Sequence, residues 1–439
     1  MSHSVKQVIW LSALLGLIVT SGCDSVDPPE FRMNMVEAVS YETSGDYQQE
    51  IADVLGAMFG TPDEPFAMSE TGLDQSKLKQ SAGPAWSDEE GYNYGLYRKH
   101  CVHCHGVTGD GRGATAQFLN PYPRDYRPGV YKFKSTYNAA RPTDDDLHRV
   151  LINGIPGTAM PSFSLLPGSE VESLVEYIKY LSYRGEMESK LIQYVFDELG
   201  EEVVEDEDGN EVIDPDTGKP KTIRTELDPA KYPEQREAIM EMLAEVIEGW
   251  DAANEMIIAP EEDSIPADER SPEEILASVE KGRELFYGTK ANCVKCHGPT
   301  GLGDGQIDDY DNWQKAHKKF LDETASLAES EELDEYEEAL LYQREEVSDS
   351  LYPLRNAIPR NLRQGVFRGG RRRLDIFRRI YTGIAGSPMP GAGPAGPGAK
   401  GTLTEQEMWS IVDYVYSLPY EPASQPQRVT PKYTEAIAN

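Results

Sequence analysis

The residues with the clearest chemistry in this sequence are two copies of one pentapeptide. Residues 101–105 are CVHCH and residues 293–297 are CVKCH, so both have the pattern CxxCH. Two thiols one helical turn apart can each form a thioether with a porphyrin vinyl group, and the next histidine then lies under the iron. The pattern predicts two covalently bound haems, with thioethers at Cys101, Cys104, Cys293 and Cys296 and proximal iron ligands at His105 and His297.

Two other chemistries use paired cysteines. A zinc site would need ligands from both pairs, but Cys101 and Cys293 are far apart in the sequence and each motif has its own downstream partner. A thioredoxin-like dithiol would accompany a βαβ pattern, which neither motif has. Haem attachment is therefore favoured over both alternatives.

The N-terminus has the features of an export signal. Lys6 precedes an apolar run at 8–19, which is too short to span a membrane as a stable helix. The small residues before Cys23 resemble a bacterial lipoprotein signal, so we expect a signal peptide at 1–22 and a lipid on Cys23, with ordinary signal cleavage as the alternative. Two haems and one lipid would use all five cysteines. Export places the protein on the periplasmic side of a bacterial membrane, and Asp24 resembles a signal for retention on the inner membrane.

The composition limits the possible partners. The 439 residues are enough for two or three domains. A formal net charge of −34 argues against binding to nucleic acid or to anionic lipid surfaces. Most of this charge is expected to keep the surface solvated, and it is compatible with a basic or neutral redox partner.

The segments that follow the two CxxCH motifs form an internal repeat. The glycine-rich stretch 106–111 corresponds to 298–305, and a longer match pairs 147–161 with 376–390. Shorter matches pair Pro123-Arg124 with Pro359-Arg360. Each repeat closes with a stretch of helical periodicity, at 170–183 and 404–418. Each also opens with one, ending in Leu96-Tyr97 and Leu285-Phe286.

This order of elements resembles the cytochrome c family, in which the terminal helices cross, CxxCH follows the first helix and a Met-Pro loop precedes the last. The resemblance implies an all-α fold with two cytochrome c-like domains in tandem. We also expect helical insertions and one small β-hairpin in the inter-domain region, turning at Asp208-Gly209. The glycine of the opening helix is present at Gly282, whereas Asn93 takes its place in the first repeat.

The expected domain boundaries follow from the repeat. After the signal come an N-terminal extension with a short helix at 23–83, a first cytochrome c domain at 84–185, an acidic inter-domain segment at 186–270, a second cytochrome c domain at 271–422 and a tail at 423–439. The second domain contains an acidic insertion at 307–352, which predicts one or two surface helices. In the inter-domain segment, we expect a helix from about 233 to 258. The extension and this segment are expected to pack on the haem domains.

The resemblance also implies distal iron ligands. Met160 and Met389 occupy equivalent Pro-flanked loops before the closing helices, with core packing as the alternative role. A thioether ligand raises the reduction potential relative to a second imidazole. Arg124 and Arg360 recur after a proline and are possible contacts of haem propionates, with surface ion pairing as the alternative.

The remaining histidines and a basic cluster are given other roles. His100, His103, His148 and His317 have no counterpart in the other repeat, so we expect surface or packing roles for them. The basic cluster 368–373 is expected to pair with the acidic insertion, or else to dock a partner.

If each iron has six ligands, four from the porphyrin and two from the protein, neither iron has a free position for a substrate. The sequence therefore predicts an electron-transfer protein, not an enzyme: a membrane-tethered dihaem cytochrome c. It would take electrons from a respiratory complex or dehydrogenase and pass them to a cytochrome or oxidase, or act as a subunit of such a complex. The alternative is a dihaem peroxidase, in which one distal position is open to peroxide. Oxidation of a sulfur compound would favour a distal cysteine, and no cysteine is spare.

Overall fold

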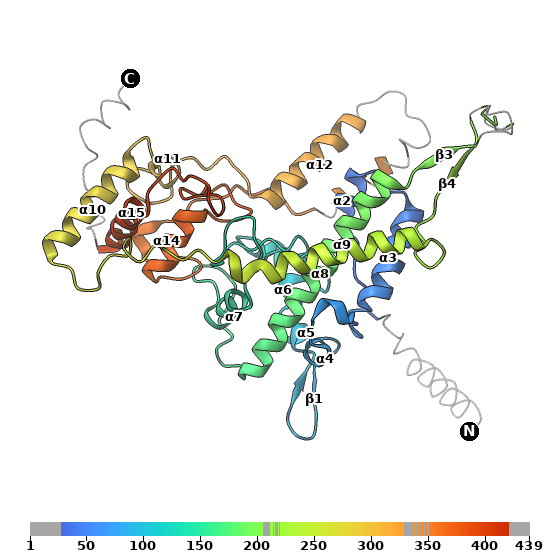
Figure 1. The fold of residues 1–439 in the computed structure, drawn as a ribbon, viewed down its shortest axis with the longest axis horizontal. Helices are drawn as coiled ribbons and strands as arrows, with labels where there is room; N and C mark the ends of the chain where they lie inside the picture. Colours follow the sequence, from blue (N-terminus) through green and yellow to red (C-terminus); the bar gives the residue numbers. More distant parts are fainter. Residues whose placement is uncertain are drawn as a thin grey trace, which may run out of the picture.

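The computed structural model describes residues 28–204, 220–328 and 351–420, with isolated positions in the two intervening gaps. The predicted signal with Cys23, the turn at Asp208-Gly209 and the C-terminal tail lie outside the described residues. In the described part, the regular secondary structure is helical apart from two short hairpins, which confirms the all-α fold with the two repeats in tandem. Figure 1 shows an elongated molecule in which the second repeat lies at one end. Among the described residues, no helix combines the length and apolar character needed to cross a membrane.

Helix α8 (Gly168–Glu198) is the centre of the core of the first repeat. Its Leu174, Tyr177, Ile178 and Leu181 are buried, as the helical periodicity predicts. The helices that contact it are α2 (Met35–Ser40), α3 (Gly45–Phe59), α4 (Gln75–Ser81), α5 (Leu96–His100), α7 (Asp144–Asn153) and α9 (Pro233–Asp251). Helix α8 thus continues past residue 185, where we expected the inter-domain segment to begin.

The opening of the first repeat differs from the prediction. A helix was expected to end in Leu96-Tyr97, but α5 begins at Leu96. Helix α5 follows a hairpin of β1 (Trp86–Ser87) and β2 (Asn93–Tyr94). Gly95, which lies between β2 and α5, has a φ of +65°. Asn93 lies in β2, where its Nδ2 donates to Glu170 Oε1 at 2.7 Å. Helix α4 makes the more extensive contact with α8, and the short α5 also touches it.

The second repeat has the predicted helix crossing. Helix α10 (Pro272–Tyr287) packs extensively against α15 (Glu405–Ser417). Both helices begin with capping boxes, at Ser271 and Thr404, which satisfy backbone N–H groups of the first turn. The other elements of this repeat are α11 (Val294–His297), η4 (Leu362–Gln364), α14 (Arg373–Thr382) and η5 (Leu418–Tyr420). The contact depends on Gly282, because a Cβ there would overlap the carbonyl oxygen of Ser410.

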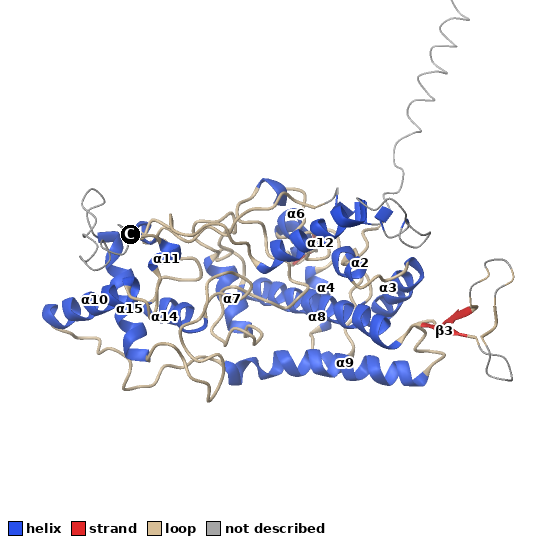
Figure 2. Cartoon of the chain, turned by 90° about the horizontal axis from the view of Figure 1, so that it is seen from above, coloured by secondary structure: helices blue, strands red, loops and turns tan. Residues whose placement is uncertain are grey.

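The inter-domain segment joins the repeats along one side. Strands β3 (Glu201–Val203) and β4 (Thr222–Arg224) form the predicted hairpin, although its second strand lies later in the sequence than expected. Figure 2 shows α9 running beside α8. The predicted helix from 233 to 258 is confirmed as α9 followed by the 3-10 helix η3 (Ala252–Met256).

The acidic insertion packs on the first repeat. Its helix α12 (Asn312–Ala328) confirms one of the predicted helices. Trp313 contacts the ring of Tyr122, and His317 Nε2 lies 3.2 Å from Arg112 Nη2. In contrast, Arg372 and Arg373 of the basic cluster 368–373 form ion pairs within their own repeat.

Within the cluster, Arg372 binds Asp375 at 2.8 Å and Arg373 binds Asp413. Both carboxylates belong to the second repeat, as the cluster does. For the described residues, the expected pairing between cluster and insertion is therefore wrong.

Replacing Gly282 by alanine is expected to destabilise the second repeat by about 1–3 kcal/mol, because the added methyl group forces α10 and α15 apart. The matched control is Gly249→Ala in α9, where an added Cβ meets no atom within 4 Å. The control is expected to be neutral or stabilising by up to about 1 kcal/mol. Urea unfolding of both variants measures the difference, and equal stabilities would contradict the close helix contact.

Candidate haem sites

The histidine of each CxxCH motif has the same backbone partner. His105 Nδ1 lies 3.0 Å from the carbonyl oxygen of Arg124, and His297 Nδ1 lies 3.3 Å from that of Arg360. A ring that donates from Nδ1 keeps the Nε2 lone pair free for a metal. Burial lowers the pKa of His105 to about 4 and also lowers the pKa of His297. Both imidazoles are therefore neutral at pH 7, as iron ligation requires.

The loops after the motifs hold these histidines in place. Gly111 N–H donates to the His105 carbonyl at 3.0 Å, and Gly303 N–H donates to the His297 carbonyl at 2.9 Å. At both glycines φ is near +80°, and a Cβ would press on the backbone at Pro123 or Pro359. Gly111 is thus equivalent to Gly303. The loop 106–111 therefore corresponds to 298–303 residue by residue, and not to 298–305 as the sequence predicted.

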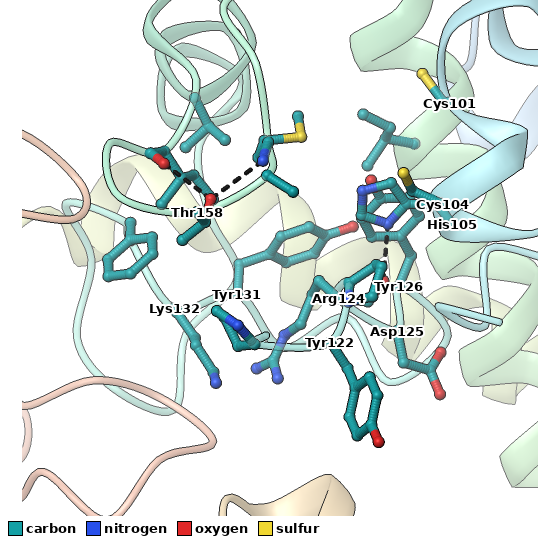
Figure 3. Close-up of a pocket in the computed structure, with 18 of the residues that line it drawn as sticks. Cys101, Cys104, His105, Tyr122, Arg124, Asp125, Tyr126, Tyr131, Lys132 and Thr158 are labelled. Atoms are coloured by element: carbon teal, nitrogen blue, oxygen red, sulfur yellow. Dashed lines mark hydrogen bonds between the residues drawn. The ribbon is translucent and has the colours of Figure 1, made fainter. Parts of the chain in front are cut away.

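In the first repeat, one cavity of about 250 Å³ collects the predicted ligands. Cys101, Cys104, His105 and Met160 all line it. Figure 3 shows the two thiols and the imidazole at one end, with Arg124 and Lys132 toward the other. The remaining lining is largely apolar, including Leu147, Leu151, Ile155, Phe163 and Ile178. This set of donors and walls fits a haem with vinyl groups at the thiol end.

The methionine loops of the two repeats have one hydrogen-bond pattern. Met160 N–H donates to Thr158 Oγ1 at 3.1 Å, and Met389 N–H donates to Ser387 Oγ at 3.4 Å. Each methionine carbonyl accepts from an isoleucine N–H at 3.1 Å, that of Ile155 or Ile384. The two thioethers are therefore presented by equivalent, internally braced loops.

Arg124 and Arg360 are also held equivalently. Arg124 Nε donates to the Val130 carbonyl at 2.7 Å, and Arg360 Nε donates to the Val366 carbonyl at 3.1 Å. Burial lowers the pKa of Arg124, with Asp311 and Asp125 acting in the opposite direction. Neither arginine forms an ion pair within the described residues. The alternative of surface ion pairing thus has no partner there, and the guanidinium of Arg124 lines the cavity.

The structure adds site residues that the sequence did not indicate. Lys132 and Arg368 line the same cavity, although Arg368 comes from the second repeat. Tyr126 stacks on His105 with ring centroids 4.6 Å apart. In the sequence, Arg368 is recognisable only as a member of the basic cluster 368–373. Its position at this cavity results from the packing of the two repeats.

The other histidines differ in their surroundings. His103 lies within the first CxxCH motif and His100 directly precedes it, and both line the cavity. His317 is buried against Trp313, and burial lowers its pKa to about 3, with Arg112 adding to the effect. The packing role expected for His317 agrees with this burial.

Family models match both repeats. Residues 93–178 match cytochrome c oxidase, cbb3-type, subunit III, and residues 279–419 match cytochrome c. Each matched segment contains one CxxCH motif and one Met-Pro loop. No curated protein matches the chain. Among solved structures, it is similar to a chain of the reducing HAO-like protein complex of Kuenenia stuttgartiensis, with 21% identity, a TM-score of 0.41 and coverage of 76% of this chain and 97% of that chain.

Replacing both Cys293 and Cys296 by alanine is expected to lower the covalent haem content from two per chain to one, because the second repeat then has no thiol to form a thioether. The pyridine haemochrome spectrum of the denatured protein measures this content. The matched control is Cys23→Ser, which is expected to keep two haems. Two covalent haems in the double alanine variant would rule out this attachment site.

Proposed function

Since the chain is a c-type cytochrome, with two cytochrome c domains that bind two haems covalently and transfer electrons, we propose that it is a single-electron carrier with His and Met ligands on both irons. His105 and Met160 would ligate the first iron, and His297 and Met389 the second. The haems supply a reversible one-electron couple. The protein supplies the ligands, excludes water and sets the potentials.

The observation that carries this proposal is the equivalence of the two methionine loops. The loops have the same backbone and hydroxyl hydrogen bonds, and Met160 lines one cavity with His105 and both thiols. A core-packing role would not require two such loops at matched positions. If Met160 and Met389 held the irons in this way, neither site would leave a position for a substrate, and the haems would supply electron exchange alone.

A dihaem peroxidase remains the alternative function. It needs one distal position that is open or that opens on half-reduction. The braced loops at Met160 and Met389 are alike, so neither repeat has the asymmetry that this mechanism needs. We therefore favour the carrier.

We also propose an exported, lipid-anchored location on the periplasmic side of a bacterial membrane, with the inner membrane favoured by Asp24. The support is the sequence up to Cys23, including the apolar run 8–19. In this location the carrier would connect a respiratory complex or dehydrogenase with a cytochrome or oxidase, or belong to such a complex. The net charge of −34 favours partners with a basic docking face.

Replacing Met160 or Met389 by alanine is expected to remove about half of the weak far-red absorption band that Met-to-iron ligation gives in the oxidised protein. Each variant loses one thioether ligand and keeps the other. Met408→Leu, which changes a buried methionine of α15 outside the site, is the matched control and should keep the whole band. An unchanged band in either alanine variant would refute that ligand.

Replacing Cys23 by serine is expected to move the exported protein from the membrane fraction to the soluble fraction, because the lipid can no longer be attached. Detergent-phase partitioning of the wild type and the variant measures the change. The haem content should be unaffected. A variant that still partitions with detergent would contradict lipidation at this cysteine.

A further inference from the structure

Each repeat extends one arginine side chain across the interface to the other repeat. Arg124 of the first repeat reaches the methionine loop of the second, where its Nη2 lies 3.4 Å from the Ala385 carbonyl oxygen. Arg360 of the second repeat reaches the methionine loop of the first, and a Cβ at Gly157 would overlap its guanidinium. The glycine equivalent to Gly157, Gly386, would place a Cβ 2.7 Å from Arg124 Nη2. Both arginines therefore lie at the interface between the haem sites.

A third guanidinium joins them. Arg368 of the second repeat lines the cavity of the first, and its Nη2 lies 3.5 Å from the Gly157 carbonyl oxygen. Its Nε is buried without a hydrogen-bond partner in the structure. Phe133 of the first repeat packs where a Cβ of Gly369 would lie, which fixes the chain beside Arg368.

The end of the cavity that holds Arg124, Lys132 and Arg368 has more positive side chains than carboxylates paired with them. Lys132 pairs with Asp311 at 3.0 Å. Within the described residues, Arg124 and Arg368 have no ion pair. The pKa of Arg368 is lowered, mainly by burial and to a smaller extent by the positive charge of Arg360. Unpaired cations that are partly buried are costly unless an anion joins them. The site therefore has room for negative charge from a ligand.

A haem has its two propionates on the edge opposite the two vinyl groups that form the thioethers. The thiols of Cys101 and Cys104 lie at one end of the cavity and Arg124 and Lys132 toward the other (Figure 3). We infer that Arg368 of the second domain binds the propionates of the haem in the first domain, together with Arg124 and Lys132. The first haem site is thus completed across the domain interface, and its potential depends on the second domain. This inference rests on the haem ligation proposed above.

The test is a redox titration that isolates each haem. Met389→His is expected to remove the far-red band of the second haem, so the remaining band reports the first haem alone, and Met160→His isolates the second haem. Arg368→Gln is then introduced into each background. If either histidine variant keeps the whole band, the ligand assignment has failed, and that result is independent of Arg368.

Removing a positive charge beside the propionates favours the oxidised iron. In the Met389→His background, Arg368→Gln is expected to lower the equilibrium constant for one-electron reduction of the first haem roughly tenfold. This corresponds to a decrease of about 59 mV in its reduction potential. The second haem, titrated in the Met160→His background, should shift less. Arg368→Lys keeps the charge and should restore most of the potential.

Arg371→Gln is the matched control. Arg371 belongs to the same basic cluster, but it is exposed and its Nη2 lies 2.9 Å from Tyr420 Oη. This substitution should leave the potential of the first haem unchanged. The inference is overturned if Arg368→Gln leaves that potential unchanged, if it shifts the second haem as much or more, or if Arg371→Gln has the same effect.

Discussion

Both haem sites depend on the hydrogen bond between the proximal imidazole and the carbonyl of an arginine. His105 Nδ1 and Arg124 O lie 3.0 Å apart, and His297 Nδ1 and Arg360 O lie 3.3 Å apart. This bond fixes the tautomer that leaves Nε2 for iron. The same arginines extend their guanidinium groups to the methionine loop of the other domain. One residue in each domain thus links the proximal ligand to the domain interface.

The sequence predicted the parts of the structure that are local or repeated. The CxxCH motifs, the Met-Pro loops and the closing helices recur at fixed places in both repeats, so the internal repeat was enough to identify them. Gly282 has no glycine counterpart in the first repeat, and its role was indicated only by the family resemblance. The crossing of α10 and α15 is confirmed because Gly282 permits the close contact with Ser410. The hydrogen-bond partners of His105 and His297 needed coordinates, since a backbone carbonyl carries no sequence signal.

The errors occurred where tertiary packing outweighed local pattern. The opening helix of the first repeat begins only after the hairpin and Gly95, and α4 makes the more extensive contact with α8. Arg372 and Arg373 pair with Asp375 and Asp413, which the fold of the second repeat brings beside them. The place of Arg368 beside the first haem cavity depends on how the two domains pack. No periodicity or spacing contains that information.

The central claim is that both irons have two protein ligands in every redox state. Electron paramagnetic resonance of the wild-type protein, recorded oxidised and half-reduced, with carbon monoxide added to the fully reduced form, tests it directly. The account predicts two low-spin ferric signals, no high-spin signal on half-reduction and no spectral change with carbon monoxide. A high-spin signal from either haem, or binding of carbon monoxide to one of them, would contradict it.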